Sequence, residues 1–264
     1  MEKIHYIKHY DNILTKAADT AIHWLFPMAT YCLCCGKYIN SSRSYCICDH
    51  CIRHINWGHV EIDLRKEGHR LGRPSCLDSA RGCMKYGLYE RRLIFDLKYD
   101  GRTYVSRAIA AIMYDRIMSD PAALSQLAKA DLIVPVPMFK EKEKERGFNQ
   151  AAKMARHLAS YMKKQQCSDM LLRRRATAAQ RSITGAERYA NMEGAFWVNP
   201  RREGDLKGKT VILVDDVYTS GATAHHCGAA LKKAGAAEVH FLGLATANVF
   251  AHGYFGLAKI QINS

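Results

Sequence analysis

The sequence predicts an α/β fold in which a parallel, doubly wound sheet is joined to a small N-terminal metal-binding module. Two observations support this prediction. From residue 131 onward, short apolar segments alternate with segments of helical periodicity, which is typical of parallel strands connected by helices. Upstream, six of the ten cysteines lie between Cys32 and Cys51, and such clustering in a chain without a secretion signal favours a metal site.

The N-terminal part of the chain contains several predicted elements and a linker. Residues 11–26 place their apolar side chains close to a helical stripe, which usually packs on its own protein, although a helix on a membrane surface or a partner has the same pattern. Residues 58–76 are polar and contain three glycines and a proline, which predicts a linker. Residues 80–88 are predicted as a strand and residues 91–111 as a pair of helices.

The C-terminal part contains the alternation of strands and helices itself. The predicted strands are residues 131–137, 208–214 and 238–246, and the predicted helices are residues 149–162 and 224–234. A basic stretch that contains glycine, residues 173–188, interrupts the series. Because the apolar strands are short and nearly continuous in hydrophobicity, they are expected to be buried on both faces of the sheet.

The overall charge is strongly positive. Lysine and arginine number 39 against 25 acidic residues, for a formal net charge of +14. Excess positive charge attracts nucleic acids, phosphorylated small molecules and anionic lipids, while a basic protein without any such partner stays an alternative. No apolar run approaches the ~20 residues that cross a bilayer. Asp11, Asn12 and Lys16 interrupt any signal-peptide core, so we expect a cytoplasmic protein without a membrane span.

The cysteine cluster has the spacing of a zinc site. Two Cys-x-x-Cys pairs, separated by twelve residues, can place four thiolates at the corners of a tetrahedron. Such a site has no open position, so the zinc would be structural, and Gly36 suits the tight turn after the first pair. Cys34, Cys46 and His50 lie close by, and a set of buried or redox-active thiols is the alternative. The expected zinc ligands are Cys32, Cys35, Cys48 and Cys51.

A second motif, VILVDDVYTSGAT at residues 211–223, has the features of a phosphate site. An apolar strand delivers Asp215 and Asp216 to its C-terminal end, where ligands bind in open α/β sheets. The small residues that follow let backbone N–H groups converge on an anion at a helix N-terminus. The two carboxylates can accept hydrogen bonds from vicinal sugar hydroxyls, so the whole motif suits a 5-phosphoribose. The expected phosphate-binding residues are Thr219, Ser220, Gly221, Ala222 and Thr223.

A capped helix and a Walker-type P-loop are the alternative interpretations of this motif. A capped helix after a buried strand, with both aspartates as incidental helix caps, would need only part of the thirteen-residue string. A Walker-type P-loop is excluded, because no Gly-Lys-Ser/Thr sequence follows the glycine.

These residues resemble a known family. Residues 211–223 resemble the binding motif for 5-phosphoribosyl-1-pyrophosphate (PRPP) of type I phosphoribosyltransferases, and the wider chain resembles the ComF family of competence proteins. The order and spacing of the shared stretches hold over most of residues 25–247. Besides the PRPP motif, these stretches are residues 32–36 with 48–51, 97–102, 134–137 with 146–151, and 175–180 with 187–196.

The chain also departs from the family pattern at two places. Residues 177–180, Thr-Ala-Ala-Gln, lack the middle hydroxyl of the family's loop motif, which leaves the fine chemistry of that loop open. Cys76 and Cys83 stand six residues apart and form no second Cys-x-x-Cys pair, so a second zinc site is not expected.

The resemblance implies roles for individual residues. Asp215 and Asp216 would hold the ribose hydroxyls, and Arg146 would touch the pyrophosphate. Residues 173–188, with Arg175 and Arg188, would form a loop that closes over PRPP. Mg²⁺ would bind together with PRPP, beside the structural Zn²⁺. The implied domains are residues 1–57 (N-terminal helix and zinc module), 58–79 (linker) and 80–264 (type I phosphoribosyltransferase fold, with its sheet and hood).

Several functions fit this resemblance. The first is a Mg²⁺-dependent phosphoribosyltransferase that acts in competence and DNA uptake on an unidentified acceptor. The second is a binding protein, either a PRPP sensor without turnover or a competence factor that binds single-stranded DNA or DNA-uptake proteins. An amidophosphoribosyltransferase with glutaminase activity is not favoured, because Glu2 stands where the N-terminal nucleophile cysteine would be.

Overall fold

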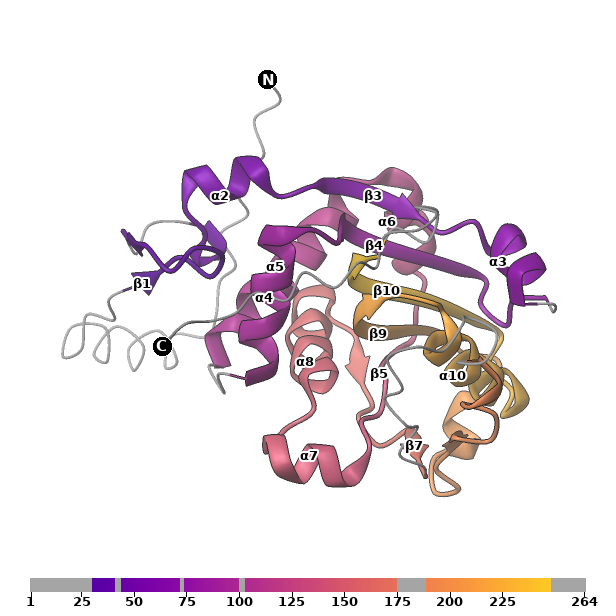
Figure 1. Ribbon diagram of the computed structural model, residues 1–264. Helices are drawn as coiled ribbons and strands as arrows, with labels where there is room; N and C mark the ends of the chain where they lie inside the picture. The colour runs from indigo at the N-terminus through magenta and orange to yellow at the C-terminus, as the bar shows by residue number, and fades with distance from the viewer. Residues whose placement is uncertain (1–29, 41–43, 72–73, 100–102, 175–188, 248–264) are drawn as a thin grey trace.

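The computed structural model describes residues 30–40, 44–71, 74–99, 103–174 and 189–247. The chain forms a central twisted sheet with helices on both faces, and a small cysteine module lies at one end of the molecule (Figure 1). The predicted helix at residues 11–26 lies outside the described residues.

The sheet has six strands in the order β3-β4-β10-β9-β5-β6. All neighbouring strands are parallel except β3, which runs antiparallel to β4 at the edge. This confirms the predicted α/β fold, in which helices cover both faces of a mainly parallel sheet. The strands are β3 (Trp57–Glu61), β4 (Ser79–Lys85), β10 (Glu238–Thr246), β9 (Thr210–Tyr218), β5 (Leu132–Pro135) and β6 (Gln165–Gln166).

Helices cover the two faces unequally. The predicted helix pair is confirmed as α4 (Leu88–Tyr99) and α5 (Thr103–Met118), and α5 packs with α8 (Gln150–Met162) on one face. The other face is covered by α10 (Ala222–Lys233) and by the hairpin of β7 (Leu171–Arg173) and β8 (Phe196–Val198). Other helices in the described part of the sheet domain are α3 (Leu64–Leu71), α6 (Pro121–Leu127), α7 (Lys140–Arg146) and the 3₁₀ turn η2 (Glu203–Leu206).

The cysteine module is small and is built from short elements. It consists of β1 (Thr30–Tyr31), β2 (Tyr38–Ile39), the 3₁₀ turn η1 (Ser44–Cys46) and α2 (Asp49–His54). Within the described part of the chain, no helix has the length and apolar character needed to cross a membrane.

Strand β9 runs through the middle of the sheet and is buried on both faces. Ile212 and Val214 belong to the core formed with α5 and α8, whereas Val211 and Leu213 belong to the core formed with α10. This alternation follows from the period of two residues along a strand. The continuous apolar run that predicted a doubly buried strand is therefore confirmed, although the strand continues past the predicted end to Tyr218.

The segment predicted as a linker, residues 58–79, is instead mostly structured. This segment contains most of β3, which pairs with β4, and all of α3. The buried side chain of Arg81 in β4 holds this edge, with ion pairs of 3.2 Å to Glu61 of β3 and 3.3 Å to Asp120 at the start of α6. The glycines suggested turns, but pairing with β4 overrides this weak local preference.

Asn149 ties the start of α8 to the loop after β5. Its Oδ1 accepts the N–H of Ala151 at 2.9 Å, and its Nδ2 donates to the carbonyl of Val136 at 3.0 Å. Both groups are buried, so neither bond can be replaced by water. Asn149 therefore caps α8 and also holds the start of α8 against the loop that follows β5.

We expect Asn149→Ala to lower the free energy of unfolding by about 2 kcal/mol, because it removes a helix cap and leaves a buried carbonyl unpaired. Denaturant unfolding measures this loss. Asn149→Ser is the matched control, since it keeps an acceptor for the helix N-terminus and should lose less. Equal losses in both variants would contradict the capping contribution.

Candidate functional site

The two aspartates lie within the last residues of β9. Asp215 pairs with Gly243 of β10, and the pairing continues to Tyr218 opposite Thr246. Each carboxylate also accepts the next backbone amide: Asp216 N donates to Asp215 Oδ1, and Val217 N donates to Asp216 Oδ1, both at 2.8 Å. These bonds orient the carboxylates at the carboxyl end of the strand, where ligands bind in such sheets.

Asp216 faces α8 and is 7% exposed. Gln150 Nε2, from the first residue of α8, lies 3.5 Å from Asp216 Oδ2. The other end of the same amide, Gln150 Oε1, accepts a 2.7 Å hydrogen bond from Arg146 Nη1. The structure thus connects two residues predicted for the site, Arg146 and Asp216, through a residue that had no predicted role. Gln150 belongs to the stretch Arg-Gly-Phe-Asn-Gln-Ala on which the resemblance partly rested.

Asp215 faces the opposite side of the sheet, toward α10 and the β7–β8 hairpin. Burial lowers the pKa of Arg173 in β7, while Cys227 and the Asp215 carboxylate act in the opposite direction. Burial likewise raises the pKa of the Cys227 thiol in α10, and the charge of Asp215 adds to this effect. The guanidinium of Arg173 lies 5.2 Å from the centre of the Phe196 ring, and its positive charge interacts with Asp215.

The residues predicted to bind phosphate form the turn between β9 and α10. Gly221 has a φ of 71°, a left-handed conformation that favours glycine, and α10 begins at the next residue. A small hollow of about 20 Å³ lies at this turn, lined in part by Asp215, Thr219 and Thr223. The hydroxyl of Thr223 donates to Met192 Sδ at 3.3 Å. The turn thus joins the carboxylates to a helix N-terminus, the partially positive end of a helix.

The other residues predicted for the phosphate site are Ser220 and Ala222, in the same segment, and Arg175 and Arg188. Ser220 is half-buried and Ala222 is buried in the first turn of α10. Arg175 and Arg188 fall outside the described residues, together with most of the predicted closing loop. The residues on either side of that loop are held in place: the Arg174 guanidinium lies 4.4 Å from the centre of the Trp197 ring, and the Tyr189 carbonyl is 2.8 Å from His226 Nε2.

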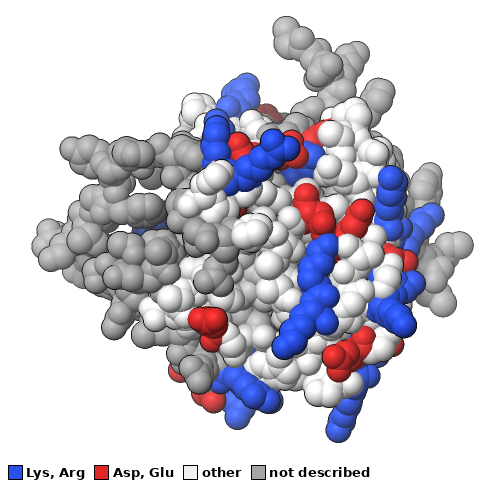
Figure 2. Space-filling view, turned by 90° about the vertical axis from the view of Figure 1, so that its right-hand side faces the viewer, with Lys and Arg blue, Asp and Glu red and all other residues white. Residues whose placement is uncertain are grey.

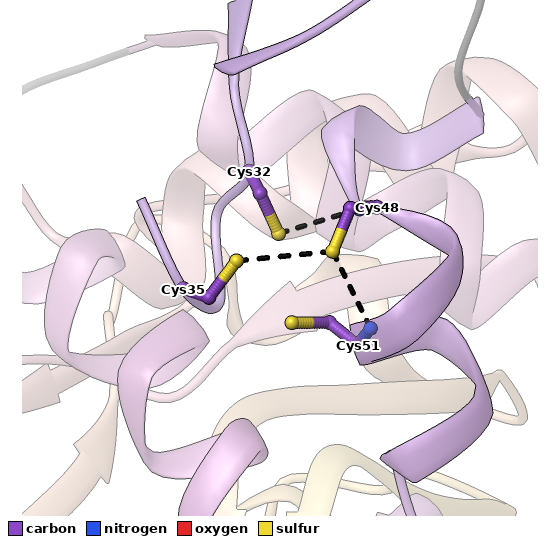
Figure 3. A group of neighbouring side chains, drawn as sticks. All are labelled: Cys32, Cys35, Cys48 and Cys51. Atoms are coloured by element: carbon purple, nitrogen blue, oxygen red, sulfur yellow. Dashed lines mark hydrogen bonds between the residues drawn. The ribbon is translucent and has the colours of Figure 1, made fainter. Parts of the chain in front are cut away.

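The four predicted zinc ligands come together at the N-terminal module (Figure 3). One pair follows β1 in the turn that leads to β2, and the other pair lies at the start of α2. Their Sγ atoms all lie within 4.8 Å of one another, which is a donor set and spacing suited to tetrahedral zinc. Gly36 has the predicted tight-turn conformation, with a φ of 73°. The four residues are Cys32, Cys35, Cys48 and Cys51.

Backbone amides point at the sulfur atoms. The N–H groups of Cys34 and Cys48 donate to Cys32 Sγ at 3.4 and 3.3 Å, and Cys51 N donates to Cys48 Sγ at 3.4 Å. Burial by itself would raise the pKa of Cys32, but hydrogen bonds from backbone amides outweigh it and lower the pKa to about 7. The same amides would support the thiolates that a zinc ion requires.

The neighbouring cysteines and histidines lie outside this cluster. Burial raises the pKa of both Cys34 and Cys46, which keeps these thiols protonated. His50 is exposed and stacks on His54, with ring centres 4.2 Å apart. Elsewhere in the described ranges, no other group of three or more His, Cys, Asp or Glu side chains converges in this way.

The positive charge is dispersed over the surface in view. Figure 2 shows basic side chains in several separate groups with acidic side chains between them. On this face, the net charge of +14 therefore does not produce one continuous basic patch.

Comparison with known proteins places these features in a family context. Residues 143–249 match the family model of the phosphoribosyl transferase domain. Competence protein F of Haemophilus influenzae is 28% identical over 155 residues, which are 59% of this chain and 67% of that protein. DNA utilization protein YhgH of Escherichia coli is 31% identical over 147 residues, or 56% of this chain and 63% of that protein. Competence protein ComFC of Bacillus subtilis is 35% identical over 106 residues, or 40% of each chain.

Among solved structures, the chain is similar to a glutamine PRPP amidotransferase from B. subtilis, with 20% identity and a TM-score of 0.36. That alignment covers 56% of this chain and 30% of the amidotransferase. A TM-score this low leaves the fold class resting on the sheet itself and on the family model.

The mainly parallel sheet and the match to the family model together identify a phosphoribosyl transferase domain, with residues 143–249 as the matched part. The chain is similar to competence protein F, YhgH and ComFC, and its cysteine cluster fits an N-terminal zinc module. The matched segments span between about two fifths and two thirds of the length of these relatives.

We expect Cys48→Ser to remove bound zinc and to unfold the N-terminal module, because a hydroxyl is a poor replacement for a thiolate ligand. Metal analysis of the purified protein measures the zinc content. Cys46→Ser is the matched control, since this thiol lies two residues away and outside the cluster, and it should retain one zinc per chain. Zinc retained at full stoichiometry in Cys48→Ser would refute the ligand set.

Proposed function

We propose that this protein binds PRPP and Mg²⁺ at the carboxyl end of β9 and acts as a phosphoribosyltransferase-like protein in the handling of DNA in the cytoplasm. The observation that supports this most directly is the continuity of Asp215, Asp216 and the turn at residues 219–223. Two carboxylates stand beside a helix N-terminus on one short segment. PRPP offers the complementary groups, a sugar diol next to a phosphate monoester.

The phosphate monoester would sit on the turn before α10. Backbone N–H groups in the first turn of a helix have no partner within the helix and can bind an anion. Thr219, Ser220 and Thr223 would add hydroxyl donors, and the Thr223 hydroxyl would then exchange its weak sulfur acceptor for a phosphate oxygen. Gly221 permits the left-handed backbone that this turn requires, and Ala222 adds only a small side chain.

The ribose and the pyrophosphate would lie next to the two carboxylates and the nearby arginines. Asp215 and Asp216 would accept hydrogen bonds from the ribose hydroxyls. Arg146, whose side chain already reaches Gln150 beside Asp216, would meet the pyrophosphate. Arg175 and Arg188 would complete the positive charge around the leaving group from the closing loop.

The surroundings of the two aspartates suit a Mg²⁺ ion that PRPP, more than the protein, would coordinate. Both aspartates already use oxygen atoms to accept backbone amides, and Asp216 also accepts from Gln150. Mg²⁺ binds oxygen ligands and usually keeps several waters, so PRPP oxygens would supply much of its coordination. When bound, the ion would neutralise charge on the pyrophosphate.

The proposed reaction is substitution at the anomeric carbon. The bond from C1 of the ribose to the pyrophosphate oxygen breaks, the leaving group takes that electron pair, and an unidentified nucleophile forms the new bond to C1. Fixed positive charge that stabilises a leaving group commonly contributes about 10²–10³ in rate. The names of the relatives, competence protein and DNA utilization protein, support DNA or DNA-uptake proteins as partners.

Isothermal titration calorimetry with PRPP and Mg²⁺ tests binding, and release of pyrophosphate with a panel of nucleobases and amines tests turnover. We expect Asp215→Asn combined with Asp216→Asn to abolish PRPP binding, because the amide nitrogens replace acceptors with donors. Asp205→Asn, at an exposed acid in η2, is the control and should bind as wild type does. Binding that survives the double change would refute the ribose assignment, and tight binding without pyrophosphate release would favour a sensor.

Arg146→Ala should weaken PRPP binding by about tenfold or more, since a hydrogen bond to a charged group contributes about 1.5–3 kcal/mol. Lys142→Ala is the control, because Lys142 is an exposed cation in the same helix. The same calorimetry measures both variants. Equal weakening in the two would assign the effect to general electrostatic attraction rather than to a contact made by Arg146.

A further inference from the structure

The turn proposed to bind phosphate rests on a buried carboxylate from a distant part of the chain. Glu67 lies in α3, within the segment predicted as a linker, and it is 5% exposed. We infer that Glu67 is a positioning residue that sets the shape of this turn, through Tyr218 on one side and His225 on the other. The inference rests on the proposed function for its ligand, while the effect on the shape of the turn can be measured without any ligand.

One carboxylate oxygen contacts both ends of the turn. The hydroxyl of Tyr218, the last residue of β9, donates to Glu67 Oε2. His225 Nε2, in the first turn of α10, lies 3.2 Å from the same oxygen. Tyr218 and His225 are each 1% exposed, so the cluster is shielded from water. Glu67 therefore fixes the distance between the end of β9 and the start of α10.

The other carboxylate oxygen lies against the backbone of the turn itself. A Cβ atom at Gly221 would collide with Glu67 Oε1 and with the Tyr218 hydroxyl. Gly221 is thus required both by its positive φ and by the close approach of α3. The carbonyl of Gly221 accepts the N–H of His225 at 2.9 Å, so the residue that contacts Glu67 also closes the first turn of α10.

A contact of this kind matters for anion binding because backbone donors bind well only when they are already oriented. Thr219 is exposed and Ser220 half-buried, so the turn has little packing on its outer side. Its inner side is held by Glu67. The buried carboxylate also needs polar partners, which the Tyr218 hydroxyl and His225 Nε2 supply.

Glu67 also connects the N-terminal part of the chain to the site. Residues 143–249 match the family model, and Glu67 lies far outside that range. It reaches the turn because β3 pairs with β4 at the edge of the sheet and α3 follows directly after it. The phosphate turn is therefore shaped by a segment outside the motif that forms it.

Three variants and one control test this inference. Glu67→Ala removes both contacts, Tyr218→Phe removes one, and Glu67→Gln retains an acceptor for the Tyr218 hydroxyl. Asp63→Asn is the matched control, since Asp63 Oδ1 accepts the N–H groups of Arg65 and Lys66 at 3.1 Å and stabilises α3 without contacting the turn. For each protein we would measure amide hydrogen exchange of residues 219–223 without ligand, and affinity for PRPP with Mg²⁺.

We expect Glu67→Ala to speed exchange in residues 219–223 and to weaken PRPP binding by about tenfold, with Tyr218→Phe intermediate and Glu67→Gln partly restored. Asp63→Asn should change neither quantity at the turn. The inference is overturned if Glu67→Ala leaves exchange unchanged, if Asp63→Asn has the same effect, or if Glu67→Gln strengthens PRPP binding by removing a repulsive charge. Failure of the wild-type protein to bind PRPP would instead refute the proposed function, while the exchange measurement would still decide the role of Glu67.

Discussion

The burial of β9 on both faces is the constraint on which the rest of the structure depends. Parallel strands flank it on both sides, and helices cover its apolar residues from above and below. Such a strand can expose polar groups only at its ends, so the change from Val214 to Asp215 places charge at the carboxyl edge of the sheet. The same burial makes the position of that edge rigid, because moving the strand would disturb two packed cores.

Three regions of the chain meet at this edge, and each brings a different kind of group. The α7–α8 junction supplies the Arg146–Gln150–Asp216 chain of hydrogen bonds. The β7–β8 hairpin supplies Arg173, whose charge lies near Asp215. Helix α3 supplies Glu67 behind the turn at Gly221. Two of these regions thus bring an arginine toward the aspartates of β9.

The cysteine module is expected to depend on metal binding for its folding, whereas the sheet domain depends on its packed core. Its elements are very short, so metal binding would supply much of its folding free energy. The ligands are close in sequence and the turns that carry them are local, which is why spacing alone predicted the cluster. The module also packs on the sheet domain, since Cys51 and Ile55 belong to the same buried core as residues of α5.

The sequence by itself determined the features that depend on local pattern. Alternating apolar segments predicted the parallel sheet and the helix pair, and the repeated two-residue spacing predicted the four cysteines that converge. Only the tertiary structure decided that residues 58–79 contain an edge strand and a helix, that Gln150 links Arg146 to Asp216, and that Glu67 lies behind Gly221. These contacts join residues that are far apart in the chain or that carry no distinctive local pattern. They arise from strand pairing and helix packing, whose energies depend on the partner surface and not on neighbours in sequence.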